Sequence, residues 1–198
     1  NFNVDGATTA VGSFYGLTDD QKAKLVDGEK TTIYGYFVSI SKSGGAPKFV
    51  NFITTHINET PAIKVENNYT SVLGTAVLND AVEVKGYISA VSTQGPILTD
   101  NGGSVLLYKT TGLAVGDEVT VTGTISSYNC GFQIGTAGIS VEKTGTTTVS
   151  YPTPMEITGA VADELLTSRT ADEYAIYAKM TGTVAVSGNY YNFNIDGA

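Results

Sequence analysis

The sequence has 198 residues, 15% of them charged, and its 11 basic against 19 acidic residues give a formal net charge of −8. This balance disfavours a nucleic-acid surface, which needs clustered Lys and Arg. The 23 glycines, the abundant Thr and Val and the lack of Trp are typical of short strands joined by glycine turns. We therefore expect an all-β protein.

The chain has one cysteine, Cys130, and one histidine, His56. A single cysteine excludes an intrachain disulfide and a thiolate metal cluster, and zinc sites and Cys/His catalysis lack sufficient ligands. We interpret Cys130 as a small, partly buried turn residue, with an intermolecular disulfide or a reactive thiol as alternatives. We expect no metal, no cofactor and no membrane span, since no stretch has the roughly 20 apolar residues that a span requires.

Residues 1–7 and 192–198 are almost the same sequence, which predicts a strand running into an Asp-Gly turn. The two segments differ only by Val4 in the first and Ile195 in the second. Chance convergence is one explanation, but the placement of the copies favours a tandem array of which this chain is one period.

After a predicted strand over residues 8–17, Thr18 followed by Gln21 indicates a capping box at the start of a short helical turn. Two further strands are predicted up to residue 58. Residues 1–58 therefore supply only the later strands of a small barrel.

Residues 25–40 and 113–128 share one pattern, which is the main internal repeat. Each has a turn glycine, Gly28 or Gly116, and a mid-strand glycine at the same spacing from it, Gly35 or Gly123. The alternation of apolar residues after the turn is that of a half-buried strand. The glycine within the strand predicts a bulge or a sharp coil that lets a sheet curl into a barrel.

The second copy belongs to a complete run of five predicted strands. Residues 81–91 form the first strand, a hairpin follows around Asn101-Gly102 with a primed turn, and residues 131–143 close the unit. Residues 174–186 repeat the pattern of 81–91 at the start of another unit. We predict the following divisions: residues 1–58, the C-terminal part of a split barrel; 59–79, a connector; 80–148, a complete barrel; 149–173, a linker with a short helix; and 174–198, the N-terminal part of the split barrel.

An unclosed sheet exposes an unpaired edge, so the split barrel requires completion. Either the two ends meet within one chain, or the tail of one chain completes the head of the next and forms a filament. The sequence leaves both open. The residues expected to carry this assembly are Phe2, Val4, Tyr190, Tyr191, Phe193 and Ile195.

The segment Gly-Leu-Ala-Val-Gly-Asp-Glu-Val-Thr-Val-Thr-Gly-Thr-Ile at 112–125, ahead of Asn-Cys-Gly-Phe-Gln-Ile at 129–134, resembles an OB-fold. With the lead-in at 152–159, it is similar to the OB-fold-like repeats of secreted and surface proteins of Bacteroidetes-type bacteria, some of which accompany nuclease domains. The resemblance implies an all-β chain with two OB-like five-stranded barrels per repeat, the second split between the termini. It also implies an extracellular or cell-surface location, and its motifs are structural rather than catalytic.

OB-folds bind single strands through aromatic residues and a basic groove. Tyr87 and Tyr108 of the complete unit offer the rings and are our candidate ligand-binding residues, but basic residues are too few for nucleic acid. Calcium at Asp100 and Asn101 is a minor alternative that lacks a recognised calcium motif.

The acidic pair Asp163 and Glu164 lies on a short predicted helix with no basic or His partner one turn on, and Asp117 and Glu118 sit in a turn, so we interpret these pairs as solvated carboxylates. We therefore expect a non-enzymatic extracellular structural or adhesive repeat protein, with copies of itself as partners and a filament as one form. The alternative is a carbohydrate- or protein-binding module of a larger surface enzyme, with a glycan or cell-surface partner.

Overall fold

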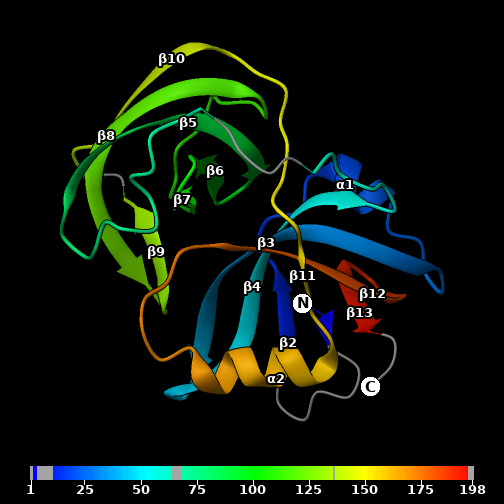
Figure 1. Cartoon of the computed structure of the whole chain (residues 1–198). Helices are drawn as coiled ribbons and strands as arrows, with labels where there is room; N and C mark the ends of the chain where they lie inside the picture. The colour runs from blue at the N-terminus through cyan, green and yellow to red at the C-terminus, as the bar shows by residue number, and fades with distance from the viewer. Residues whose placement is uncertain (1, 4–10, 64–67, 136, 196–198) are drawn as a thin grey trace.

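The computed structural model describes residues 2–3, 11–63, 68–135 and 137–195. Strands hold 51% of the chain and helices 9%, which confirms the all-β prediction (Figure 1). The elements are β1 (Phe2–Asn3), β2 (Val11–Phe14), α1 (Asp19–Ala23), β3 (Lys30–Ser43), β4 (Ala46–Ile57), β5 (Ala81–Ser92), β6 (Gly95–Thr99), β7 (Ser104–Leu107), β8 (Asp117–Tyr128), β9 (Gly131–Ile134), β10 (Ser140–Thr146), β11 (Met155–Glu156), α2 (Gly159–Ser168), β12 (Ile176–Ser187) and β13 (Tyr190–Ile195).

Strands β5 to β9 close into a five-stranded barrel, which is the green unit in Figure 1. β5 pairs with β6 and with β8, and β6 pairs with β7, all antiparallel. β9 completes the ring because it runs parallel to β7 and antiparallel to β8. The region 131–143, expected as one closing strand, forms two, since β10 leaves the ring and pairs with the first half of β8.

The other strands form a seven-stranded sheet, here called the terminal sheet because both ends of the chain contribute to it. Its order is β1-β2-β4-β3-β12-β11, and β13 pairs with β12 beside this path. β2 runs parallel to β4, whereas β4 with β3, β3 with β12 and β12 with β13 are antiparallel. β1 pairs antiparallel with β2 and also lies against β13.

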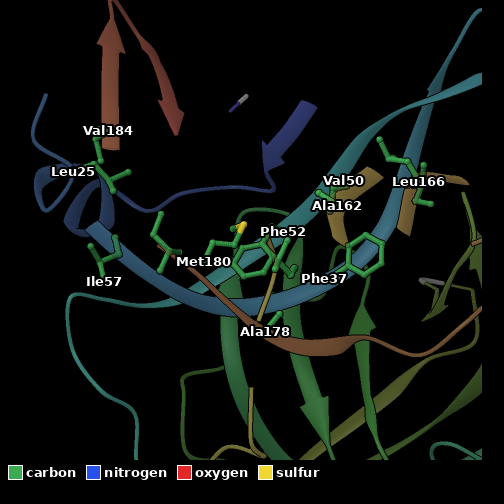
Figure 2. Packing of buried hydrophobic residues seen from close by; sticks show 13 residues of the cluster. Leu25, Phe37, Val50, Phe52, Ile57, Ala162, Leu166, Ala178, Met180 and Val184 are labelled. Atoms are coloured by element: carbon green, nitrogen blue, oxygen red, sulfur yellow. The ribbon is translucent and has the colours of Figure 1, made fainter. Parts of the chain in front are cut away.

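The core of the terminal sheet joins residues that are far apart in the sequence. Figure 2 shows Phe37, Phe52 and Met180 packed in its middle, with Ala162 and Leu166 of α2 beside Val50 at one end. α2 lies within the range where a short helix was expected, and Thr158 caps its first turn. At α1, Thr18 and Gln21 form the predicted capping box.

The expected primed turn at Asn101-Gly102 does not form. Neither Asn101 nor Gly102 has the positive φ that a primed turn requires, and the Asp100 carboxylate instead accepts hydrogen bonds from the amides of Gly102 and Gly103. Of the two mid-strand glycines, Gly35 lies at a register shift between β3 and β4, as a bulge there requires, whereas Gly123 pairs with Val82 without a shift. A side chain at Gly123 would meet Ile134 inside the barrel at 2.7 Å, so close packing is the reason for this glycine.

A cluster of aromatic and aliphatic side chains joins the barrel to the terminal sheet. Tyr36 lies 5.0 Å from Tyr177 between ring centroids, and Tyr151 stacks on Tyr177 at 4.8 Å. The Tyr151 hydroxyl donates to the Ser89 carbonyl of the barrel at 2.8 Å. The buried members of this interface cluster are Tyr36, Val38, Ile53, Ala90, Ile97, Leu106, Tyr151 and Tyr177.

The interface tyrosines should make the fold sensitive to alkali. Burial raises the pKa of Tyr36, Tyr151 and Tyr177, and raises that of the neighbouring Tyr87 to about 12. Their protonated side chains therefore stabilise the fold fully below the ordinary pKa of 10.0. This stabilisation is lost as the pH rises towards the raised pKa values that the tyrosines have in the folded protein. Each such tyrosine adds a slope of about 1.4 kcal/mol per pH unit to the loss of unfolding free energy.

Denaturant unfolding at successive pH values, with tyrosinate absorbance followed in parallel, measures this slope. Tyr151→Phe should make it shallower, whereas Tyr128→Phe should not, because Tyr128 is 51% exposed. Equal slopes in the two variants would contradict the assignment.

Candidate functional site

OB-fold proteins bind oligonucleotides and oligosaccharides on the face formed by their strands 2 and 3. The second and third strands of this barrel are β6 and β7, and every residue of both is buried. Ile97 and Leu106 point out of the barrel into the interface cluster, where they meet side chains of the terminal sheet. A ligand could reach this face only if the terminal sheet separated from the barrel.

The turn between β8 and β9 is also held against the terminal sheet. The Asn129 carbonyl accepts from the Ile40 amide at 2.8 Å, and a side chain at Gly131 would collide with the Val38 carbonyl. Cys130 is a partly buried turn residue, as expected. Its carbonyl accepts a hydrogen bond from Arg169 at 2.8 Å. This second region is therefore a contact within the chain.

The two candidate tyrosines do not form one site. Tyr108 is partly buried against the interface cluster, with the Lys109 ammonium 5.2 Å from its ring centroid. Tyr87 is only 5% exposed and donates to the Ser150 carbonyl at 2.8 Å. Tyr87 lines a hollow on the outer face of the barrel, and Tyr108 does not.

This hollow, here called the Tyr87 hollow, has a volume of about 220 Å³. Three residues form a row across the strands on this outer face: Tyr87 on β5 lies opposite Glu118 on β8, and Glu118 lies opposite Gly145 on β10. The Tyr69 ring lies 5.9 Å from that of Tyr87, and its hydroxyl donates to the Glu118 carboxylate. The described lining residues are Asn68, Tyr69, Tyr87, Glu118, Thr147, Thr148 and Ser150.

The Tyr69 and Tyr87 hydroxyls stay protonated near neutral pH and can therefore donate hydrogen bonds. Burial raises the pKa of Tyr69, and the hydrogen bond to Glu118 raises it further. Burial likewise raises the pKa of Tyr87 to about 12, although its hydrogen bond to Ser150 opposes the rise. The hollow therefore presents neutral phenols beside one carboxylate.

The expectation that Asp117 and Glu118 are two solvated carboxylates is wrong for Asp117. Its side chain is buried, receives the Ala114 amide at 2.9 Å and pairs with Lys143 at 2.6 Å. The hydrogen bond from Lys143 lowers the pKa of Asp117, helped by the Ala114 amide. Alternation along β8 thus separates the two acids: Asp117 serves the fold, and Glu118 faces the hollow.

The predicted assembly residues lie at the strands contributed by the two ends of the chain. Phe2 pairs with Gly12 through β1, and Tyr190, Phe193 and Ile195 pair with β12 through β13. Tyr191 is partly buried against the core of the terminal sheet. Val4 lies outside the described residues.

The oxygens of Asp100, the calcium alternative, bind backbone amides. One oxygen accepts from Val72 and Leu73 at 2.7 and 2.8 Å, and the other accepts from Gly102 and Gly103 at 2.6 and 2.9 Å. The carboxylate therefore ties the segment before β5 to the β6–β7 turn. Within the described ranges, no three His, Cys, Asp or Glu side chains are grouped as metal ligands would be.

No protein-family model matches the sequence, and comparisons with curated proteins and with solved structures likewise find no match. The helices of the described part of the chain are all too short or too polar to cross a membrane.

Sequence reasoning missed Tyr69 and the role of Glu118. The signal that could have found Glu118 is its position one residue before Val119, a core residue, because alternation then directs Glu118 outwards. Nothing in the sequence places Tyr69 beside it, since Tyr69 lies in a segment without regular structure.

Removing the Asp100 carboxylate should destabilise the barrel. Asp100→Ala leaves four backbone amides without their acceptor, and we expect a loss of about 3 kcal/mol in the free energy of unfolding. Urea unfolding followed by circular dichroism measures it. Asn101→Ala, at the exposed neighbouring position, is the matched control, and similar losses in both variants would refute the role given to Asp100.

Proposed function

We propose that this chain is a non-enzymatic structural or adhesive repeat of an extracellular, cell-surface protein, built from two OB-like barrels of which the second is split between the ends of the chain. The observation that carries the proposal is a strand-for-strand correspondence between the terminal sheet and the closed barrel. Three features support the extracellular location. They are the low share of charged residues, 15%, the glycine-rich strands and the resemblance to surface repeats.

The correspondence holds for every pairing around the ring. β12, β2, β3 and β4 match β5, β7, β8 and β9, and the position of β6 is shared by β13 and β1. The parallel pair β2–β4 matches β7–β9, and each antiparallel pair has its counterpart. Such agreement in order and direction supports one unit used twice.

Local geometry supports the same duplication. Gly28 and Gly116 both have positive φ, at 78° and 92°, in the turns before the matching strands β3 and β8. Their amides donate over the same distance, 2.8 Å, to Val184 on β12 and Ile88 on β5, which are the matching first strands. The hairpins that follow also agree, because both central residues of each turn have positive φ, as in a type I′ turn.

The split supports assembly between copies of the chain. In the barrel, β6 pairs with β5 on one edge and with β7 on the other. In the terminal sheet these two pairings are divided, since β13 pairs with β12 and β1 pairs with β2. β1 and β13 come from the two copies of one repeated sequence. The β12–β13 hairpin of one chain can therefore occupy the same position beside β3 of another chain, in a head-to-tail exchange of strands.

The alternative, a carbohydrate- or protein-binding module of a larger surface enzyme, is favoured by a different observation. The Tyr87 hollow combines two aromatic rings with a carboxylate on the exposed side of the barrel. This observation bears on binding and is independent of how the terminal sheet is completed.

Strand exchange can be tested by disulfide trapping across the β3–β12 pair. Thr32 and Thr181 lie directly opposite each other, with their hydroxyl oxygens 3.0 Å apart, so cysteines there meet the geometry of a disulfide. One chain carries Thr32→Cys and the other Thr181→Cys, both with Cys130→Ser. We expect a covalent heterodimer after mixing and oxidation at high protein concentration, detected on a non-reducing gel.

A chain with Thr122→Cys replaces the Thr32→Cys chain as the control, because Thr122 pairs with β5 and β10 rather than with β12. The double variant Thr32→Cys/Thr181→Cys reports closure within one chain. If the double variant cross-links internally while the mixed single variants form no more heterodimer than the control, head-to-tail assembly is refuted.

A further inference from the structure

A glycine ends the row of residues on the outer face of the barrel that includes two lining residues of the Tyr87 hollow. Tyr87, Glu118 and Gly145 are neighbours on β5, β8 and β10. A side-chain carbon at Gly145 would lie 2.6 Å from Oε2 of Glu118. The glycine therefore leaves this side of the Glu118 carboxylate uncovered by a neighbouring side chain.

The lining of the hollow combines rings with hydrogen-bonding groups. Each described lining residue carries a polar side-chain group, and no Val, Leu or Ile is among them. The carboxylate of Glu118 accepts hydrogen bonds, while the exposed Asn68 and Thr148 add an amide and a hydroxyl. Such a lining can hydrogen-bond several hydroxyls of one ligand and also offers rings against which C–H groups pack.

Size and charge narrow the class of ligand. A volume of about 220 Å³ lies below the range usual for drug-sized ligands and suits a single ring. The carboxylate of Glu118, within a protein of net charge −8, disfavours an anionic ligand. A neutral sugar fits both limits, because its hydroxyls need acceptors and its ring needs an apolar surface.

We propose that the Tyr87 hollow binds one neutral pyranose ring of a glycan, with Glu118 accepting hydrogen bonds from its hydroxyls and the tyrosine rings packing against its C–H groups. The site lies away from β6 and β7, whose outer face is covered by the terminal sheet. This inference rests on the alternative function given above, a carbohydrate-binding module, which it deepens, and it does not depend on strand exchange.

Binding can be tested by NMR titration of the whole chain with methyl glycosides of glucose, galactose, mannose and N-acetylglucosamine in the millimolar range. We expect saturable shifts for at least one glycoside. Glu118→Gln keeps the shape of the side chain but removes its charge, and should weaken binding by about tenfold or more, as for a lost hydrogen bond to a charged group. Choline is titrated as a cationic probe of the same carboxylate and rings.

A second variant protects the test against misfolding. Thr148→Arg places a guanidinium at the exposed rim, where it blocks the hollow, and Thr146→Arg is the matched control at another exposed position. Thermal melts check the fold of each variant. The proposal is overturned if no glycoside gives saturable shifts, if only choline does, or if Glu118→Gln and Thr148→Arg bind as tightly as Thr146→Arg. Any of these results leaves the disulfide-trapping result on assembly unchanged.

Discussion

The outer face of β6 and β7 is buried, and this burial holds the barrel and the terminal sheet together. A barrel of this size packs its interior with its own side chains, so its outer face is normally available to solvent or to a ligand. Here that face carries Ile97 and Leu106, which are buried against Tyr36 and Val38 of the terminal sheet. The chain therefore uses the outer face of these two strands as an internal interface between the barrel and the terminal sheet.

A buried arginine shows how closely this interface is fitted. Arg169, directly after α2, is only 3% exposed and lies with its guanidinium 4.3 Å from the Phe37 ring centroid. It donates to the carbonyls of Cys130, Glu173 and Tyr174, and no ion pair with a described carboxylate offsets the cost of its burial. Burial lowers the pKa of Arg169. The Nη1 atom of Arg169 is buried without a hydrogen-bond partner among the described residues, so the hydrogen bonds of Nε and Nη2 and the contact with Phe37 are what hold the turn after β8 against the terminal sheet.

Sequence reasoning predicted the features that depend on neighbours in the chain. The capping box at Thr18, the strand predicted over residues 81–91 and the equivalence of Gly28 with Gly116 follow from local pattern, and the structure contains each of them. Features that depend on which strands meet were not predictable. Tyr87 and Glu118 become neighbours only through the register of β5 against β8, which the sequence does not give. The conformation of the turn at Asn101 is set by the preceding Asp100, whose carboxylate accepts hydrogen bonds from amides of two separate segments. Tertiary partners therefore overrode the local preference for a primed turn.

The repeated sequence at the two ends gives the terminal sheet a property that the barrel lacks. In the barrel one strand pairs on both edges, so the ring has no end. In the terminal sheet β1 pairs with β2 and β13 pairs with β12, and these two strands, which come from the two copies of the repeated sequence, lie against each other. On our proposal, exchange of strands between chains replaces each backbone pairing by an identical one, so the contact energy hardly changes. The equilibrium between closure within one chain and assembly between chains is then set by the protein concentration. Closure within one chain has the advantage of a high effective concentration. On our proposal, assembly is therefore favoured where the chains are crowded, as in a tandem array or on a cell surface.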